Sequence, residues 1–447
     1  MYLDYDLVLK DWLTKGIIER VTDENILQPL KSHYLPHRAV VKEGSTTRIR
    51  PVFDASAKDI NGYSVNGCLE SGPNLIELIP KVLTNFRLHA FALTADIEKA
   101  FLQIRIDHDD RDMLRFLWWE DNHVIVYRHA RVVFGLSCSP FLLGAVLNNL
   151  LENAPTNLRH VAKALLKTFY VDNCLTGVNS ISEQENFIND AQTLLKLEGF
   201  NLRGWVGNGY FKTPDQVENV LGLRWLCSKD ELYCNIQPLN IKDSVLTRRT
   251  FLSCAQKVFD PIGFTAPVGL IPKIILKTTW TLKVGWDEEL PQNLQVQFQK
   301  WVEELGCLKM CVLSRRIFLN ASSTVHVFCD ASKAAFGCCI FLRSEVDGII
   351  DINLILAKSR VAPIKPITLP RLELMGAITG VRLSCLALQC LNNPKVPVYY
   401  WLDSTVVLAW IAKQGKWSVF VENRVKEINR LTHTTTVPTG SYRRRTE

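Results

Sequence analysis

The chain has 447 residues, of which 47% are apolar and 22% charged, with a net charge of +7. This composition excludes a disordered chain, and the length corresponds to about three domains. The 13 cysteines show no CxxC or Cys/His spacing, which excludes a zinc site and indicates reduced thiols in an intracellular, cytoplasmic protein. No signal peptide and no apolar run of membrane-spanning length is present, so we expect a soluble protein without a membrane partner.

The first predicted elements are an amphipathic helix from Leu7 to Leu13 and a strand that carries two arginines. Arg48 and Arg50 alternate with Ile49, which places both guanidinium groups on one face of the strand. Guanidinium groups bind phosphate oxygens well, but a solvated basic strand at the edge of a sheet has the same pattern. The strand alone therefore leaves both interpretations open.

The next predicted strand ends in a carboxylate. The apolar run Phe91–Leu93 leads to Asp96, and an aromatic residue, Phe101, follows five positions later. Taken alone, Phe101 is explained as a core residue. The acidic stretch 107–112 lacks the glycine and terminal glutamate of a calcium loop, so we predict a solvated turn there.

A helix is predicted from Ser139, with Ser139 as its N-cap and Pro140 at its first position. Phe134 and Gly135 stand just before it. Because glycine has no Cβ, Gly135 would allow a close approach of the backbone to a ligand.

A hairpin with an acidic tip is predicted at Phe169–Thr176, with Asp172 in the turn. Asp and Asn are common in turns for local reasons, so the turn alone indicates nothing more. Asp96 changes this interpretation, because two strand-end carboxylates can hold two divalent cations roughly 3.5–4 Å apart, as in phosphoryl transfer.

These blocks together resemble the reverse transcriptases of LTR retrotransposons, most closely those of the BEL/Pao group. The family has an Asp with an aromatic residue five positions later, then F-G followed by S-P, then Y-V-D-D. This chain has Asp96 with Phe101, Phe134-Gly135 with Ser139-Pro140, and Tyr170-Val171-Asp172-Asn173. Asn173 departs from the pattern, since the family usually has a second Asp there.

The resemblance implies roles for these residues. Asp96 and Asp172 would bind the polymerase cations, Mg²⁺ or Mn²⁺, with help from the backbone carbonyl of Ile97, and Asn173 would occupy the second acidic position. Phe101 would exclude a 2′-hydroxyl, so that deoxynucleotides are selected. The remaining implied nucleotide contacts are those of the triphosphate with Arg50, and secondarily Arg48, and of the base and sugar with Gly135.

The middle of the chain shows no catalytic constellation. By the same resemblance, residues 226–320 correspond to a thumb and connection, which grip a duplex through its backbone. No D-[ST]-G turn occurs in the chain, so proteolysis is not predicted.

The C-terminal part is predicted to form three strands, a helix, a fourth strand and a further helix. Asp330 ends the first strand, Glu373 lies in the first helix, and Asp403 follows the fourth strand. Each carboxylate alone is explained by a helix cap or an exposed charge, but their order resembles the ribonuclease H fold. That fold implies two-metal hydrolysis of the RNA strand of an RNA–DNA hybrid, with Asp330, Glu373 and Asp403 as catalytic metal ligands.

The fourth acid of the ribonuclease H family is not recognised in this chain. A last strand is expected at Thr434–Gly440, and Arg443, Arg444 and Arg445 follow it where the acid should stand. Glu447 is the alternative source of that carboxylate. We therefore expect weak hydrolysis at most.

The predicted fold class is a multidomain α/β and α+β protein with a right-hand polymerase architecture. Residues 1–225 would form fingers and palm, residues 226–320 a thumb and connection, and residues 321–447 a ribonuclease H-like domain without its C-terminal helix.

The predicted function is RNA-directed and DNA-directed DNA synthesis by a retrotransposon polyprotein fragment. The expected partners are an RNA template, a DNA primer, an RNA–DNA hybrid and deoxynucleoside triphosphates, in the cytoplasm or in a virus-like particle if the element is intact. The alternative is an impaired remnant that only binds nucleic acid or protein. The oligomeric state stays open.

Overall fold

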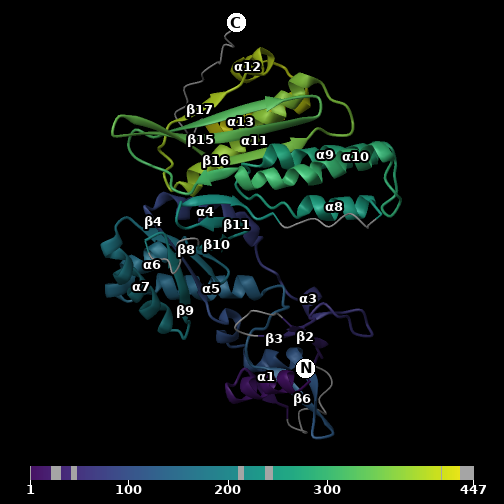
Figure 1. Cartoon of the computed structure of the whole chain (residues 1–447), viewed down its shortest axis with the longest axis vertical. Coiled ribbons are helices and arrows are strands. Elements are labelled where there is room, and N and C mark those ends of the chain that lie inside the picture. The colour runs from purple at the N-terminus through teal and green to yellow at the C-terminus, as the bar shows by residue number, and fades with distance from the viewer. Residues whose placement is uncertain are drawn as a thin grey trace. The chain divides into compact units, whose positions relative to one another are not determined.

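The computed structural model describes residues 2–21, 32–41, 48–209, 216–236, 245–413 and 415–432. The chain divides into two compact units, each made of several segments (Figure 1). Unit 1 comprises Met1–Ile76, Thr94–Cys174 and Ser182–Trp205. Unit 2 comprises Glu77–Leu93, Leu175–Ile181 and Val206–Glu447.

Unit 1 holds, wholly or in part, the elements of the N-terminal half of the chain. Its helices are α1 (Tyr2–Thr14), α3 (Val65–Cys68), η2 (Leu75–Leu78), η3 (Ala100–Gln103), η4 (His108–Leu114), α5 (Ser139–Glu152), η5 (Thr156–Leu158), α6 (Arg159–Leu165) and α7 (Ile181–Lys196). Its strands are β1 (Ile18–Arg20), β2 (His37–Val41), β3 (Ile49–Phe53), β4 (Phe91–Ile97), β5 (Arg115–Glu120), β6 (His123–His129), β7 (Phe169–Tyr170), β8 (Asn173–Val178) and β9 (Leu202–Gly207).

One core of unit 1 lies between α1 and two small sheets, β1-β6-β5 and β2-β3. Helix α1 buries Tyr5, Leu9 and Trp12, which recur at the spacing that places side chains on one helical face. They pack with Phe53 of β3 and Phe116 of β5. Aromatic and aliphatic side chains therefore share this core.

The candidate polymerase residues lie on a different sheet, with the strand order β7-β8-β4-β9. Strand β4 is buried from Ala92 to Ala95, which agrees with a near-continuous apolar strand at a central position. Strands β7 and β8 form a hairpin in which Tyr170 pairs with Asn173. The predicted hairpin is confirmed.

Unit 2 holds α4 and the C-terminal half of the chain. Its helices are α4 (Ile79–Leu88), α8 (Arg248–Gln256), α9 (Ala266–Thr281), α10 (Gln292–Glu304), η6 (Leu305–Met310), α11 (Leu369–Cys390), α12 (Thr405–Ala412) and α13 (Val419–Thr432). Its strands are β10 (Val217–Val220), β11 (Leu223–Leu226), β12 (Glu231–Cys234), β13 (Val312–Ser314), β14 (Thr324–Ala331), β15 (Ala335–Val346), β16 (Ile349–Val361) and β17 (Val398–Trp401).

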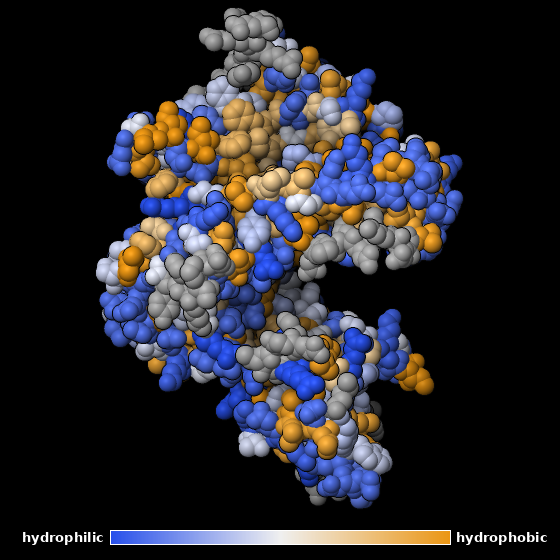
Figure 2. All heavy atoms as spheres, in the orientation of Figure 1, coloured by the Kyte–Doolittle hydropathy of each residue, from blue (hydrophilic) through white to orange (hydrophobic). Residues whose placement is uncertain are grey.

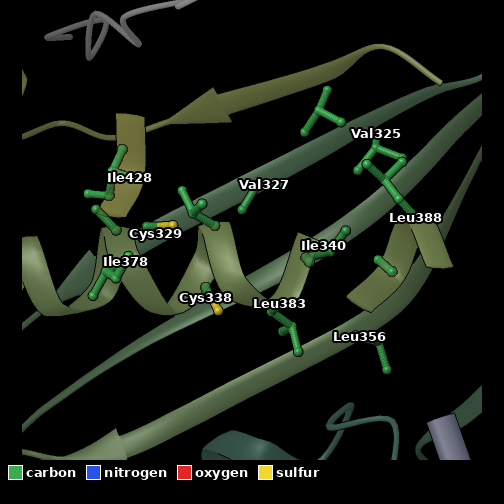
Figure 3. Close-up of a cluster of buried hydrophobic side chains, with 14 of the residues drawn as sticks. Val325, Val327, Cys329, Cys338, Ile340, Leu356, Ile378, Leu383, Leu388 and Ile428 are labelled. Carbon is green, nitrogen blue, oxygen red and sulfur yellow. The ribbon is translucent and has the colours of Figure 1, made fainter. Parts of the chain in front are cut away.

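The largest core of unit 2 lies between the sheet β16-β15-β14-β17 and helices α11 and α13. Val325, Val327 and Cys329 alternate along β14 and all point towards α11, as Figure 3 shows. This is the two-residue period expected for a strand with one face buried. Ile428 of α13 joins the same cluster.

Two glycines of α11 let this helix approach the sheet closely. A Cβ on Gly380 would lie 2.3 Å from Sγ of Cys329, and one on Gly376 would lie 3.1 Å from the carbonyl oxygen of Asp330. Because both distances are below ordinary contact, a side chain at either position would push the helix away. The close approach brings the first turns of α11 to the end of β14, where Asp330 stands.

Helix α11 is, by length and composition, apolar enough to cross a membrane, the one such helix among the residues that the structure describes. The expectation that no segment reaches that length is therefore wrong by this criterion. The physical reason is packing, since 56% of its apolar window is buried inside the fold.

Several predicted boundaries differ from the structure. Ser139 is the first residue of α5 and not its N-cap, because its hydroxyl donates to the carbonyl of Val133 instead of capping the helix. Strand β16 begins at Ile349, whereas the sequence pattern predicts a strand from Leu354 to Val361 only. Its hairpin with β15 exposes Ile349, Ile350 and Ile352. Figure 2 shows apolar atoms gathered over this hairpin, at the upper left. The predicted last strand, Thr434–Gly440, lies outside the described residues, as do Arg443–Arg445 and Glu447.

Candidate active site

Asp96 is exposed near the end of an otherwise buried strand. Its neighbours in β4, Ala95 and Ile97, are both buried, because alternate side chains of a strand face opposite sides of the sheet. The sheet thus presents one carboxylate to solvent from a rigid position.

Asp172 lies in the two-residue turn Val171-Asp172 between β7 and β8. Val171 has φ = 58°, a left-handed conformation that is strained for a β-branched residue. The surrounding hairpin holds this strained turn, and the turn sets the direction of the half-buried Asp172 side chain.

A backbone hydrogen bond brings the two carboxylate positions together. The N–H of Ile97 donates to the carbonyl of Asp172 at 3.0 Å, so the residue after Asp96 is fixed to the hairpin tip. Burial raises the pKa of Asp172 above its ordinary value, and the negative charge of Asp96 raises this pKa further, against the opposing effect of a backbone hydrogen bond. The sheet therefore brings the predicted pair to one edge.

Asn173 is engaged with Asp172. Its side-chain Nδ2 donates to Oδ1 of Asp172 at 3.0 Å. One oxygen of the Asp172 carboxylate thus accepts a hydrogen bond from an uncharged amide, where a second aspartate would bring a like charge.

Four residues near Asp96 received no role from the sequence: Glu98, Asn201, Arg203 and Gly204. Glu98 accepts a hydrogen bond from Nδ2 of Asn201 at 2.8 Å and forms an ion pair with Arg203 at 3.0 Å. Gly204 has φ = 70°, and a Cβ on it would lie 3.0 Å from Oδ1 of Asp96. The contacts of Glu98 join the end of β4 to the start of β9. Gly204 leaves the space beside Asp96 open, because it has no side chain.

The predicted nucleotide-binding residues gather around the loop before α5. The buried ring of Phe101 meets the ring of Phe134 edge to face, with 4.8 Å between the ring centroids. Gly135 has φ = 116°, and a Cβ on it would lie 2.3 Å from the carbonyl oxygen of Phe53. Only glycine fits this close approach to β3.

Arg48 and Arg50 are both exposed, and Ile49 between them is buried, which confirms the predicted alternation. Arg50 lies on β3, opposite Val40 of β2. The same strand ends at Phe53, against Gly135, so one strand connects the predicted triphosphate contact to the predicted sugar contact.

A second group of carboxylates lies in unit 2. Strands β14 and β17 are parallel neighbours, and Phe328 pairs with Trp401. Asp330 and Asp403 each stand two residues after this last pair. A cavity of about 690 Å³ is lined by both aspartates and by the aromatic residues Phe264, Phe328, Phe341 and Trp401.

Glu373 of α11 is held by a residue next to Asp403. The hydroxyl of Ser404 donates to Oε2 of Glu373 at 2.5 Å, and Ser404 also accepts a hydrogen bond at the start of α12 from the N–H of Val407. Among the described residues, no group of three or more His, Cys, Asp or Glu side chains is arranged to hold a metal ion. Both sites thus rest on pairs of carboxylates.

Two family models match separate parts of the chain. Residues 40–203 match reverse transcriptase (RNA-dependent DNA polymerase), and residues 247–404 match the Pao retrotransposon-like RNaseH-like domain. A search of curated proteins found no match.

The fold is similar to that of three solved structures of the foamy viral protease–reverse transcriptase. One, with double-stranded DNA and described as dRH, has a TM-score of 0.65 at 16% identity and covers 98% of this chain and 69% of that chain. Another with double-stranded DNA has a TM-score of 0.65 at 15% identity and covers 99% of this chain and 83% of that chain. A third, with an RNA/DNA hybrid, has a TM-score of 0.61 at 15% identity and covers 98% of this chain and 53% of that chain. At this identity the likeness shows the fold alone.

The fold and the two family matches agree in order with the motifs found in the sequence. The chain carries a reverse transcriptase domain followed by a Pao retrotransposon-like RNaseH-like domain, which confirms its resemblance to the polymerases of Pao-type retrotransposons.

Proposed function

We propose that this chain is an RNA-directed and DNA-directed DNA polymerase of a retrotransposon. The observation that carries the proposal is the pairing of Asp96 with Asp172 at one sheet edge, inside the part of the chain that matches reverse transcriptases. In the proposed reaction the primer 3′-oxygen attacks the α-phosphorus of a deoxynucleoside triphosphate. The bond from that phosphorus to the bridging oxygen breaks, pyrophosphate leaves, and the hydroxyl proton passes to solvent.

The donor set fits Mg²⁺ or Mn²⁺, because these cations take charged oxygen ligands from rigid elements. The charge of Asp96 raises the pKa of Asp172, so an added positive charge would stabilise the ionised form of Asp172. The residues that would hold the metal are Asp96, Asp172 and the carbonyl of Ile97. When bound, the metal supplies charge stabilisation to the transferred phosphoryl group.

The proposed substrates follow from the nucleotide-binding residues. Arg50 would contact the triphosphate, and Gly135 would let the backbone reach the base and sugar. Phe101 would lie under the sugar, where a rigid and buried ring leaves no room for a 2′-hydroxyl. The proposed partners are an RNA template and a DNA primer, and the duplexes in the similar foamy viral structures support nucleic-acid partners.

We also propose that the C-terminal domain hydrolyses RNA–DNA hybrids weakly or not at all. Asp330 and Asp403 line the same cavity, but Glu373 is hydrogen-bonded to Ser404, and the described residues supply no third clustered acid. A labelled hybrid with Mg²⁺ or Mn²⁺ tests this. We expect no cleavage above background, whereas cleavage that is lost in Asp403→Asn would show that the domain is complete.

The second candidate function is a remnant that binds nucleic acid without extending it. The hydrogen bond from Asn173 to Asp172 favours this alternative, because it engages a carboxylate oxygen that a cation would need as a ligand.

One experiment separates the two candidates. The purified chain is given a primer annealed to an RNA or a DNA template, and binding and single-nucleotide extension are measured on the same sample. Extension on both templates supports the polymerase. Tight binding without extension at any Mg²⁺ or Mn²⁺ concentration would support the remnant.

A further inference from the structure

Asn66 joins α3 by hydrogen bonds to two other stretches of unit 1, one at Ala55 and Ser56 and one at Gly135 and Ser137. Its backbone N–H donates to the carbonyl of Ala55 at 2.9 Å. Its side-chain Nδ2 donates to the hydroxyl of Ser56 and to the carbonyl of Gly135, both at 2.9 Å, and its Oδ1 accepts from the N–H of Ser137 at 2.8 Å. Both polar atoms of the side chain are therefore engaged.

The bonds to Gly135 and Ser137 hold a loop that is constrained from its other side as well. Gly135 lies against the carbonyl of Phe53, where a Cβ would come within 2.3 Å, and Phe53 itself belongs to the aromatic core. The loop is thus clamped between β3 and the Asn66 side chain. An asparagine suits this position because its amide offers donors and an acceptor at once.

The clamped loop carries Phe134, whose ring contacts Phe101. The two ring planes meet at 71°, the edge-to-face geometry that aromatic pairs favour. Phe134 is half exposed and Phe101 is buried, so Phe134 packs against the outer side of the Phe101 ring. A movement of Gly135 would carry Phe134 with it and leave the Phe101 ring without its neighbour.

We propose that Asn66 is a positioning residue for sugar selection. It fixes the loop Phe134–Ser137, and through Phe134 it holds the Phe101 ring in the orientation that excludes a ribonucleotide. This inference rests on the proposed polymerase function, since it concerns the same nucleotide site.

The test compares Asn66→Ala, Phe134→Ala and the double variant with wild type. The matched control is Asn61→Ala, an exposed asparagine of the same segment whose backbone N–H donates to Asp59. We measure kcat and KM for a deoxynucleotide and for the matching ribonucleotide. Asn66→Ala removes the two hydrogen bonds that hold the loop, those with Gly135 and Ser137. Their loss corresponds to a change of about ten- to hundredfold in the population of the ordered loop.

In Asn66→Ala, we therefore expect the KM for the deoxynucleotide to rise by about ten- to hundredfold, with a smaller change in kcat. The preference for the deoxynucleotide should fall. In the Phe134→Ala background, the same substitution should add little to that loss, because the coupling passes through Phe134. Unchanged discrimination in Asn66→Ala, additive losses in the double variant, or an equal loss in Asn61→Ala would overturn the inference.

Hydrogen exchange at the Ser137 amide provides a readout that needs no catalysis. Exchange should accelerate in Asn66→Ala and stay as in wild type in Asn61→Ala. If wild type extends no primer, the proposed function fails, and this exchange still decides whether Asn66 holds the loop. Equal exchange in wild type and Asn66→Ala would reject the positioning role in either case.

Discussion

At the scale of single residues, Asn173 sets the charge of the candidate polymerase site. Its amide donates to Asp172, where a second carboxylate would instead have added negative charge for two dications. Loss of one preorganised electrostatic group typically lowers a rate by about 10²–10³-fold.

Asn173→Asp should therefore raise the rate of primer extension or lower the Mg²⁺ concentration that it requires. The rate of single-nucleotide incorporation, measured across a Mg²⁺ titration, checks this. Equal rates at limiting Mg²⁺ would show that position 173 does not contribute to the metal site.

Phe101 is the residue that we expect to select the sugar. Phe101→Val removes the ring and opens space, so the variant should incorporate ribonucleotides that wild type excludes. The measurement is the ratio of kcat/KM for a deoxynucleotide to that for its ribonucleotide. An unchanged ratio, in a variant that still extends with deoxynucleotides, would mean that Phe101 is a core residue only.

His129 gives unit 1 a dependence of stability on pH. The side chain is fully buried, its ring nitrogens have no hydrogen-bond partner among the described residues, and burial lowers its pKa from 6.5 to about 3, with His37 adding to the effect. Between the folded pKa of about 3 and the ordinary pKa of 6.5, the His129 side chain binds a proton in the unfolded chain but not in the folded chain. Stability therefore falls as the pH falls below 6.5.

The free energy of unfolding should fall by about 1.4 kcal/mol per pH unit, or by about 2 kcal/mol between pH 6.5 and 5. Carboxylates with a lowered pKa, such as Asp112 in its ion pairs, lose their contribution only below their ordinary pKa of 3.8, so they add little to the slope between pH 5 and 6.5. Denaturant unfolding followed by hydrogen exchange of unit 1 peptides checks it. His129→Phe should flatten the slope, and an unchanged slope in that variant would contradict the assignment.

At the scale of elements, two buried arginines tie distant segments of unit 2 together. Arg87 at the end of α4 donates to the carbonyls of Ser314, Arg315 and Leu354. Arg315 donates to both oxygens of Asp230 and to carbonyls at the end of α4. Burial lowers the pKa of Arg87 to about 10, and the charge of Arg315 contributes. Asp230 is thus the carboxylate that compensates this pair.

Asp230→Asn should destabilise unit 2 by about 3–5 kcal/mol, because it leaves buried cations without a compensating charge. The matched control is Asp287→Asn, whose partner Arg249 is exposed, so that its cost should be far smaller. Denaturant unfolding of both variants gives the two values. Similar costs for the two substitutions would contradict the role assigned to Asp230.

The same elements show what the sequence could and could not predict. Asp96, Asp172, Asp330 and Asp403 were found because each follows an apolar run, and strand ends are visible as a local pattern. Asn66, Glu98 and Arg87 were missed because their partners lie 69, 103 and 228 residues away. A polar side chain in a loop or helix carries no local signal of a partner at that separation.

At the scale of the whole molecule, the order of domains was predicted from motif order and is confirmed by the family matches. The proposed boundaries at residues 225 and 320 stay predictions. They do not follow the division by contacts, in which Glu77–Leu93 belongs to unit 2 with the C-terminal half. The sequence gives no local sign that Glu77–Leu93 belongs with the C-terminal half, because α4 has the pattern of an ordinary amphipathic helix.

The central claim is that Asp96 and Asp172 form the catalytic pair of a polymerase. The most direct measurement is Mg²⁺-dependent primer extension on an RNA template by wild type, Asp172→Ala and the surface control Asp190→Ala, at equal folded concentration. We expect extension by wild type and Asp190→Ala, and none by Asp172→Ala with primer–template binding retained. Extension by Asp172→Ala at the wild-type rate would contradict the assignment of the site.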